Sequence, residues 1–332
     1  MFWRVVFTIS VIIMKEKLRE FGELLIDESL SKYTTYKIGG TTKYLLRPTS
    51  IDNLVSALKY LENEKVSYFI LGNGSNLIIK DDYYDGVVIK VDLLKKFKID
   101  EENLVLDAEA GVFLPLISNK LAKMGYSAFE WAGGLPGTVG GSIYGNAEAY
   151  KVPISDVLLD VTVFQNGEIK VYKKEDIKFE YRKSQFKKMK DTVILSARFK
   201  LEKKDAKELD EIMKKRAKKR LDTQPLEFPS AGSVFRNPHI DKYEKEAKKY
   251  NIPVNENGFI SSGYLIEHCG LKGKKIGGAM VSEKHANFII NVDNATSDDV
   301  INLMNLIRET VKEKYEIELK SEQQIIDLAK EE

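Results

Sequence analysis

The chain has 332 residues, of which 52 are Lys or Arg and 50 are Asp or Glu, so its formal net charge is only +2. This near-balance argues against a dedicated nucleic-acid-binding protein, whose binding surface is usually strongly basic. Hydrophobic residues make up 43% of the chain, which excludes wholesale disorder. The single cysteine, Cys269, excludes an intramolecular disulfide and CxxC zinc sites, and three scattered histidines form no metal-binding pattern. We therefore expect a cytoplasmic globular protein of two or three domains without a resident metal.

The first fourteen residues, MFWRVVFTISVIIM, are almost all apolar. The run is shorter than the roughly 20 residues that span a bilayer, and it lacks the basic start and the small residues of a secretory signal. Export stays an alternative. We favour an extension that precedes a translation start at Met14, and we expect no membrane association.

The N-terminal part of the chain, to about residue 95, is predicted to form one α/β unit. A charged, helix-compatible stretch follows Met14, and residues 33–48 are interpreted as two strands joined by a Gly-Gly turn. Leucines at helical spacing predict a helix over residues 51–63. Two β-rich runs then surround the turn at residues 72–76.

From Leu104 onward the pattern changes to short strands interrupted by glycine. The segment VTVFQNGEIKVY predicts a hairpin, because Asn-Gly suits a two-residue type I′ turn. Residues 191–201 are predicted to form one more strand. Residues 203–220 predict a charged helix whose basic end is solvated, with anion binding by its last arginines as the alternative. A final helix with an apolar face is expected to begin at Thr296 or Ser297.

Two glycine-rich segments are the strongest candidates for a ligand site. Residues 72–76, Gly-Asn-Gly-Ser-Asn, separate two predicted strands, and successive backbone N–H groups in such a turn can hold phosphate. A plain turn is the alternative, because neither a Rossmann nor a Walker A motif is present. Residues 133–141 have five glycines in nine positions, which favours close approach to a large flat or phosphorylated ligand over a structural loop.

Three further residues have ordinary structural interpretations when each is taken alone. Arg182 can be a surface arginine, Ser233 a turn serine and Glu322 a solvated acid. The histidines are interpreted as polar contacts, because the adjacent His268 and Cys269 point apart in regular structure and no orienting group is indicated.

Seven segments, in this order, resemble the UDP-N-acetylenolpyruvoylglucosamine reductase (MurB) family of peptidoglycan precursor synthesis. They are YTTYKIGG, YFILGNGSNLII, EWAGGLPGTVGGSIYGNAEAY, FEYRKSQF, QPLEFPSAGSVFRNP, GYLIEHCGLKGKKIGGAMVSEKHANFIIN and EIELKSEQQII. The resemblance covers residues 27–328 and implies an α+β fold with an FAD-binding domain of the PCMH or vanillyl-alcohol-oxidase type. This domain is expected over residues 33–202, with subdomains 33–95 and 96–202, and a C-terminal substrate-binding domain over residues 221–332.

The resemblance implies a flavin-dependent reductase that converts the enolpyruvyl ether of UDP-N-acetylglucosamine to UDP-N-acetylmuramate. NADPH is the implied hydride donor to non-covalent FAD. After NADP+ leaves, the sugar nucleotide takes the place of the nicotinamide nucleotide in the same pocket. No nucleic-acid or membrane partner is implied, and we expect a monomer. The short connection after Tyr150 resembles the type II subgroup, which lacks an inserted loop over the substrate.

The resemblance also implies roles for individual residues. Arg182 matches the arginine that stabilises a dianionic intermediate, Ser233 the proton donor, and Glu322 the acid that helps to polarise the substrate. The implied FAD contacts are Gly39, Gly72, Asn73, Gly74, Ser75, Asn76, Gly134, Pro136, Gly137, Thr138, Gly140, Gly141, Asn146 and Ala147. The implied substrate contacts are Tyr144, Tyr181, Arg220, Asn237 and, where glutamine is more usual, His268.

Three positions depart from the family pattern in charge. Glu148 stands where glycine is usual, Gln324 where an arginine helps to bind substrate, and Thr223 where a lysine precedes the QP step. Two cations are therefore missing near the expected diphosphate. We hypothesise that another basic residue replaces them: Arg216, Arg220 or Lys274.

Two other functions stay open as alternatives. A flavin oxidase with covalent FAD needs a His or Cys near the flavin loops, and neither residue type occurs before residue 239. A nucleotide-binding protein that has lost catalysis is motivated by Gln324, and turnover with NADPH would distinguish it from an enzyme.

Overall fold

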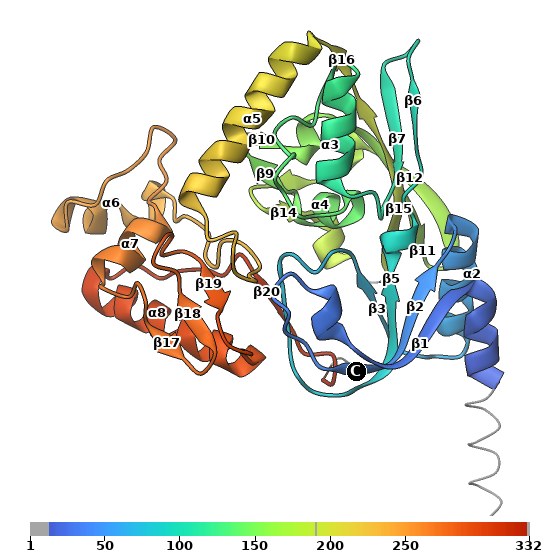
Figure 1. The fold of residues 1–332 in the computed structure, drawn as a ribbon, viewed down its shortest axis with the longest axis horizontal. Helices are drawn as coiled ribbons and strands as arrows, with labels where there is room; N and C mark the ends of the chain where they lie inside the picture. Colours follow the sequence, from blue (N-terminus) through green and yellow to red (C-terminus); the bar gives the residue numbers. More distant parts are fainter. Residues whose placement is uncertain (1–12, 190, 331–332) are drawn as a thin grey trace, which may run out of the picture.

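The computed structural model describes residues 13–189 and 191–330. Along these residues Figure 1 shows two bodies that follow each other in the chain and a C-terminal lobe, drawn in orange and red, beside them. The prediction for the apolar N-terminal extension falls largely on residues 1–12, which lie outside the described part. Within the described ranges, every helix is too short or too polar to span a bilayer.

The first body is a four-stranded sheet packed against one long helix. In sheet order its strands are β1 (Gly22–Ser29), β2 (Thr41–Pro48), β5 (Tyr84–Lys90) and β3 (Tyr68–Leu71). Strand β1 is antiparallel to β2, and the other two pairs are parallel. Helix α2 (Ile51–Asn63) starts after Ser50, whose side chain caps it, and buries its leucines against the sheet. The helix predicted over residues 51–63 is thus confirmed.

The strand predicted at the start of residues 33–48 was wrong. This part of the chain forms the end of the 3-10 helix η1 (Leu30–Tyr33) and a loop, in which Thr34 Oγ1 donates to the Ile38 carbonyl at 2.8 Å. Tyr36 and Ile38 are buried against the C-terminal lobe and not in a sheet. Their apolar alternation therefore reflects packing between two bodies.

The second body is a five-stranded antiparallel sheet with three helices. In sheet order its strands are β12 (Glu168–Lys173), β11 (Leu158–Gln165), β15 (Thr192–Lys200), β7 (Val105–Glu109) and β6 (Phe97–Asp100). The helices are α3 (Leu114–Lys123), α4 (Val139–Gly145) and α5 (Ala206–Thr223). The short elements are η2 (Val91–Leu93), β8 (Tyr126–Ser127), β9 (Glu148–Ala149), β10 (Val152–Pro153), η3 (Ile154–Asp156), η4 (Lys174–Asp176), β13 (Phe179–Glu180), β14 (Lys183–Ser184), η5 (Gln185–Lys188) and β16 (Glu202–Lys203).

Three predictions for the second body are confirmed. Asn166 and Gly167 have φ of 52° and 77°, and a type I′ turn requires both to be positive. The strand predicted over residues 191–201 is β15, and the helix predicted over residues 203–220 is α5. Helix α3 was not predicted, because the glycines around it indicated short strands. Its buried residues Leu114, Ile117 and Leu121 do have helical spacing.

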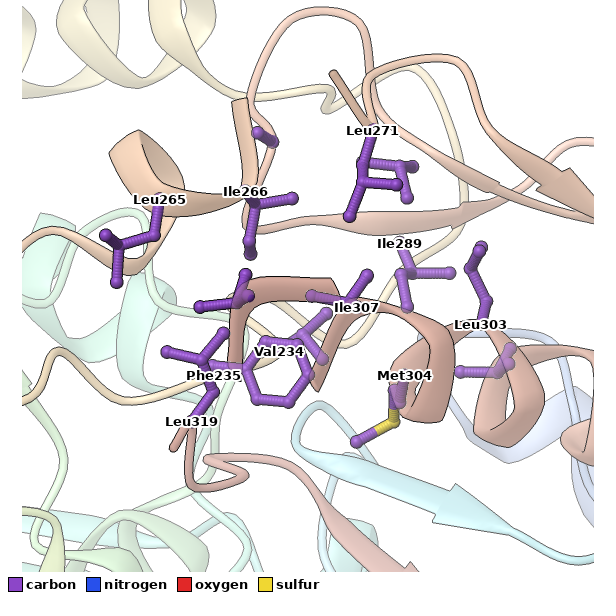
Figure 2. Close-up of a cluster of buried hydrophobic side chains, with 14 of the residues drawn as sticks. Val234, Phe235, Leu265, Ile266, Leu271, Ile289, Leu303, Met304, Ile307 and Leu319 are labelled. Atoms are coloured by element: carbon purple, nitrogen blue, oxygen red, sulfur yellow. The ribbon is translucent and has the colours of Figure 1, made fainter. Parts of the chain in front are cut away.

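The C-terminal lobe packs three helices on a small sheet. These elements are α6 (Ile240–Lys249), α7 (Ser262–His268), β17 (Lys275–Ile276), β18 (Ala279–Val281), β19 (Ile289–Asn291) and α8 (Ser297–Tyr315). Figure 2 shows the core, where Ile266, Ile289, Leu303 and Ile307 point toward one another from α7, β19 and α8. Thr296 caps α8 in a reciprocal capping box, which confirms the predicted start of the final helix.

After α8 the chain returns to the first body. Strand β20 (Gln324–Ile326) pairs in parallel with β4 (Leu77–Ile79), and the Gln324 N–H donates to the Asn76 carbonyl at 3.0 Å. The lobe is joined a second time by the Tyr36 hydroxyl, which donates to the Ile289 carbonyl at 2.8 Å. The residues just before β20 therefore lie beside the turn at residues 72–76.

A protein that starts at Met14 is expected to fold as stably as the full chain. The described helix over residues 13–21 places Leu18, which is fully buried, and Phe21 in the core of the first body. Thermal unfolding of the shortened protein should match that of the full chain, whereas Leu18→Ala should cost about 2–5 kcal/mol. A large loss of soluble protein on shortening would contradict the expectation.

Candidate functional site

The two glycine-rich segments lie against each other in the structure. The Asn73 side-chain amide donates to the Pro136 carbonyl at 2.6 Å. A Cβ on Gly72 would lie only 2.9 Å from Thr138 Oγ1, and Thr138 caps α4 by accepting from the Gly141 N–H. The turn after β3 and the start of α4 are thus brought together, as one ligand site requires.

The backbone of this turn fits a phosphate-bearing ligand. Gly74 has φ of +60°, and a Cβ there would lie 2.7 Å from the Tyr33 carbonyl oxygen, so only glycine fits. Lys90, at the end of β5, is buried and donates to the Gly72 carbonyl. Burial lowers the pKa of the Lys90 ammonium. A buried lysine that contacts a glycine-containing turn favours a pyrophosphate there, because successive backbone N–H groups in such a turn can hold phosphate, and so the residues present fit FAD.

Arg182 and Glu322 form the polar centre of the site. Arg182 stands between β13 and β14 with φ of 58°, a left-handed conformation that is uncommon for arginine. Its Nε lies 3.0 Å from Glu322 Oε1, and the two side chains are only 25% and 15% exposed. Its Nη1 donates to the Glu148 carbonyl at 3.1 Å. Glu148 thus contributes its backbone carbonyl to the site. The departure from the family pattern that the sequence indicated was its side-chain charge.

Ser233 lies beside Glu322 through backbone contacts on both sides. The Glu322 N–H donates to the Val234 carbonyl at 2.8 Å, and the Gln323 side-chain amide donates to the Gly232 carbonyl at 3.0 Å. Ser233 is half-buried, and its hydroxyl has no hydrogen-bond partner among the described residues. The structure therefore gathers Arg182, Ser233 and Glu322, and leaves the serine hydroxyl available to a ligand.

Three cations act on the carboxylate of Glu322. Burial raises the pKa of Glu322, and Arg182, Arg236 and Lys187 oppose that rise. Burial, reinforced by the charge of Arg236, lowers the pKa of Lys187 to about 8. Sequence reasoning missed Lys187, Arg236 and Lys90, since a lysine or arginine after an apolar residue gives no signal of burial.

The other predicted contacts of the ligand site fall into two groups. Tyr181 and Tyr144 line the same region: the Tyr181 ring packs on Phe259 with centroids 5.2 Å apart, and the Lys187 ammonium lies 5.8 Å from the Tyr144 ring centroid. The Asn146 amide donates to the Glu180 carbonyl, while its buried Oδ1 has no partner in the described chain. This oxygen can accept a hydrogen bond from a ligand.

Three other predicted residues make contacts within the protein. The His268 ring stacks on Tyr264 of the same helix, and the His268 carbonyl accepts a hydrogen bond from the Lys314 ammonium. The Asn237 side-chain oxygen accepts a hydrogen bond from the Ser262 N–H at the start of α7, and its predicted substrate contact stays a prediction. The backbone at Gly39 approaches Leu30 and Ile79, so its close contacts are with protein.

Of the proposed replacement cations, two lie along α5 near the glycine loop. A Cβ on Gly134 would lie 2.6 Å from Arg220 Nε, and burial lowers the pKa of this guanidinium. Arg216 lies over the Tyr150 ring at 4.6 Å, and its buried Nη1 has no hydrogen-bond partner within the described ranges. Lys274 lies instead in the C-terminal lobe, where its carbonyl accepts the Val281 N–H.

Gly74→Ala is expected to weaken FAD binding by at least about tenfold, equivalent to about 1.4 kcal/mol, because the turn must move away from Tyr33. The matched control is Gly167→Ala, which has a similar φ of +77° but open space around a Cβ, in the hairpin between β11 and β12. Titration of each apoprotein with FAD, followed by flavin fluorescence, measures the effect. Equal FAD affinities for the two variants would contradict the assignment of the turn.

Comparison with known proteins gives a consistent set of relatives. A family model described as "UDP-N-acetylenolpyruvoylglucosamine reductase, C-terminal domain" matches residues 224–326, and one described as "FAD binding domain" matches residues 42–171. The UDP-N-acetylenolpyruvoylglucosamine reductase of Caldanaerobacter subterraneus is 39% identical and aligns over 94% of this chain and 96% of its own. That of Carboxydothermus hydrogenoformans is 40% identical, over 94% and 98%.

A solved structure agrees with these sequence matches. The crystal structure of UDP-N-acetylenolpyruvylglucosamine reductase (MurB) from Thermus caldophilus superposes with a TM-score of 0.73 and 30% identity. The match covers 92% of this chain and 98% of that chain. The FAD-binding α+β fold class expected from the sequence is thereby confirmed.

Proposed function

The chain belongs to the UDP-N-acetylenolpyruvoylglucosamine reductase family, and on that basis we propose how its residues carry the family's reaction. It is an FAD-dependent oxidoreductase that reduces the enolpyruvyl ether of UDP-N-acetylglucosamine in peptidoglycan precursor synthesis. The observation that carries the residue assignment is the pairing of Arg182 with Glu322 beside Ser233, next to the glycine-lined turn.

FAD, when bound, supplies the hydride chemistry, and the protein holds and orients the reacting groups. We assign the pyrophosphate to residues 72–76, where backbone N–H groups and the Lys90 ammonium offer donors and positive charge. The flat ring system is assigned to residues 133–141, with Asn146 Oδ1 as a hydrogen-bond acceptor. Arg216 and Arg220 are proposed to replace the cations absent at Thr223 and Gln324.

Arg182 is proposed to stabilise the charge that develops on the substrate. Hydride addition to the vinyl terminus leaves negative charge delocalised into the substrate carboxylate, and a well-placed donor is worth about 3–4 kcal/mol to such a state. The guanidinium is held in advance, since Glu322 and the Glu148 carbonyl each contact one of its nitrogens. This preorganisation avoids a reorientation cost at the moment of reaction.

Ser233 is proposed to donate the proton that completes the reduction. A neutral hydroxyl is a weak acid, but the enolised carboxylate is a strong base, so a positioned serine suffices. Glu322 is proposed to keep Arg182 in place and to polarise the substrate. Burial raises the pKa of Glu322, and its neighbouring cations oppose this rise and so favour the ionised form that these roles need.

The proposed hydride donor is NADPH, and the proposed state of the protein is a cytoplasmic monomer. The test is an absorbance spectrum of the purified protein, followed by NADPH oxidation with and without the enolpyruvyl sugar nucleotide. A flavin band and substrate-dependent NADPH loss are expected. A yellow but inactive protein would point to a changed substrate through Gln324 and Thr223. A colourless protein that takes up no FAD would overturn the function.

A further inference from the structure

Lys187 contacts the backbone of the residue proposed to stabilise the reaction's negative charge. Its Nζ donates to the carbonyl oxygen of Arg182 at 3.3 Å. Arg182 is the residue with the left-handed φ of 58° at the turn between β13 and β14. Because a non-glycine residue rarely keeps this conformation without support, a hydrogen bond to its carbonyl helps to fix the direction of the guanidinium.

The surroundings of Lys187 contain an excess of positive charge. The charged groups that act on it are Arg236, Glu322, Lys183 and Arg182, of which only Glu322 is an anion. The Nε atoms of Arg182 and Arg236 are buried without an aligned hydrogen-bond acceptor in the described residues. Buried donors and unneutralised cations are unfavourable unless an anion completes the site.

We propose that Lys187 is a positioning residue that holds Arg182 in its left-handed conformation and whose positive charge is balanced when the substrate carboxylate enters. This inference rests on the proposed function of Arg182. Substrate binding then raises the pKa of Lys187, which burial and Arg236 hold at about 8 in the free protein. Substrate binding above about pH 8 is accordingly accompanied by proton uptake.

The experiment compares Lys187→Met and Lys187→Arg with Lys188→Met, an exposed lysine next in the chain. Rapid mixing measures reduction of the bound flavin by NADPH and, separately, its reoxidation by the enolpyruvyl sugar nucleotide. We expect Lys187→Met to slow reoxidation by about 10- to 100-fold and to leave reduction within about twofold. Lys187→Arg should restore most of the reoxidation rate, and Lys188→Met should leave both rates unchanged.

Two readouts separate a positioning role from a structural one. For the wild-type protein, kcat/KM for the sugar nucleotide should fall above about pH 8 as Lys187 loses its proton, and this fall should be absent in Lys187→Arg. Below about pH 8 the Lys187 amine is charged in the folded protein, and its lowered pKa means that folding makes this charge less favourable. Lys187→Met removes the charge and should therefore melt at pH 7 no lower than the wild type. A packing role would lower the melting temperature instead.

Three results would overturn the inference. Normal reoxidation in Lys187→Met, with an active wild type, would remove the role of Lys187 and leave the proposed function intact. A lower melting temperature with equal loss in both half-reactions would make Lys187 structural. A wild-type protein that never oxidises NADPH with this substrate would overturn the proposed function, and the inference with it.

Discussion

Ser233→Ala is expected to slow reduction of the enolpyruvyl substrate by about 10²- to 10⁴-fold, the usual contribution of a positioned general acid. Flavin reduction by NADPH should stay within about twofold of the wild type, because that step needs no proton from Ser233. The hydroxyl has no partner among the described residues, so its removal breaks no internal hydrogen bond. Single-turnover mixing of the two half-reactions measures each rate by flavin absorbance.

Ser230→Ala is the matched control, since Ser230 is a half-buried serine three positions earlier in the same loop. It should leave both half-reactions unchanged. If Ser233→Ala slows both half-reactions equally, Ser233 shapes the pocket and does not donate the proton. Product formed in heavy water should also carry one solvent deuterium, and the carbon that carries it is the site of proton delivery.

The elements set by local chemistry could be predicted from the sequence. The Asn166-Gly167 turn and the Thr296 cap of α8 were predicted because single residue types decide them. The strand expected before β2 was wrong, because Tyr36 and Ile38 are buried by a lobe that is distant in sequence. An apolar alternation shows that side chains are buried, but it does not show against what.

The site itself could be predicted only in part. The glycine segments indicated a ligand, and the resemblance named Arg182, Ser233 and Glu322, yet Glu322 taken alone looked like a solvated acid. It is buried because β20 pairs with β4, a contact between residues about 250 positions apart. Lys187 lies in a basic stretch that resembles a surface segment, and two of the charges that act on its pKa, Arg236 and Glu322, come from the distant C-terminal part of the chain.

Arg182→Met is expected to slow reoxidation of the reduced flavin by the enolpyruvyl substrate by about 10²- to 10³-fold, as loss of an oxyanion donor does. Arg182→Lys should recover only a part of this loss, because an ammonium cannot contact both Glu322 and the Glu148 carbonyl with the fork of a guanidinium. Single-turnover reoxidation measures both variants. Flavin reduction by NADPH serves as the internal control and should change little.

A double-mutant cycle with Glu322→Gln tests whether Arg182 acts together with its partner. Removing Arg182 takes away the foremost charge that opposes the raised pKa of Glu322, so the carboxyl is expected to bind a proton at higher pH in that variant. Each single variant should therefore lose most of what the pair contributes, and the double variant should be little slower than Arg182→Met. Losses that simply multiply would show that the two residues act independently, and the ion pair at 3.0 Å would then have no part in orienting the guanidinium.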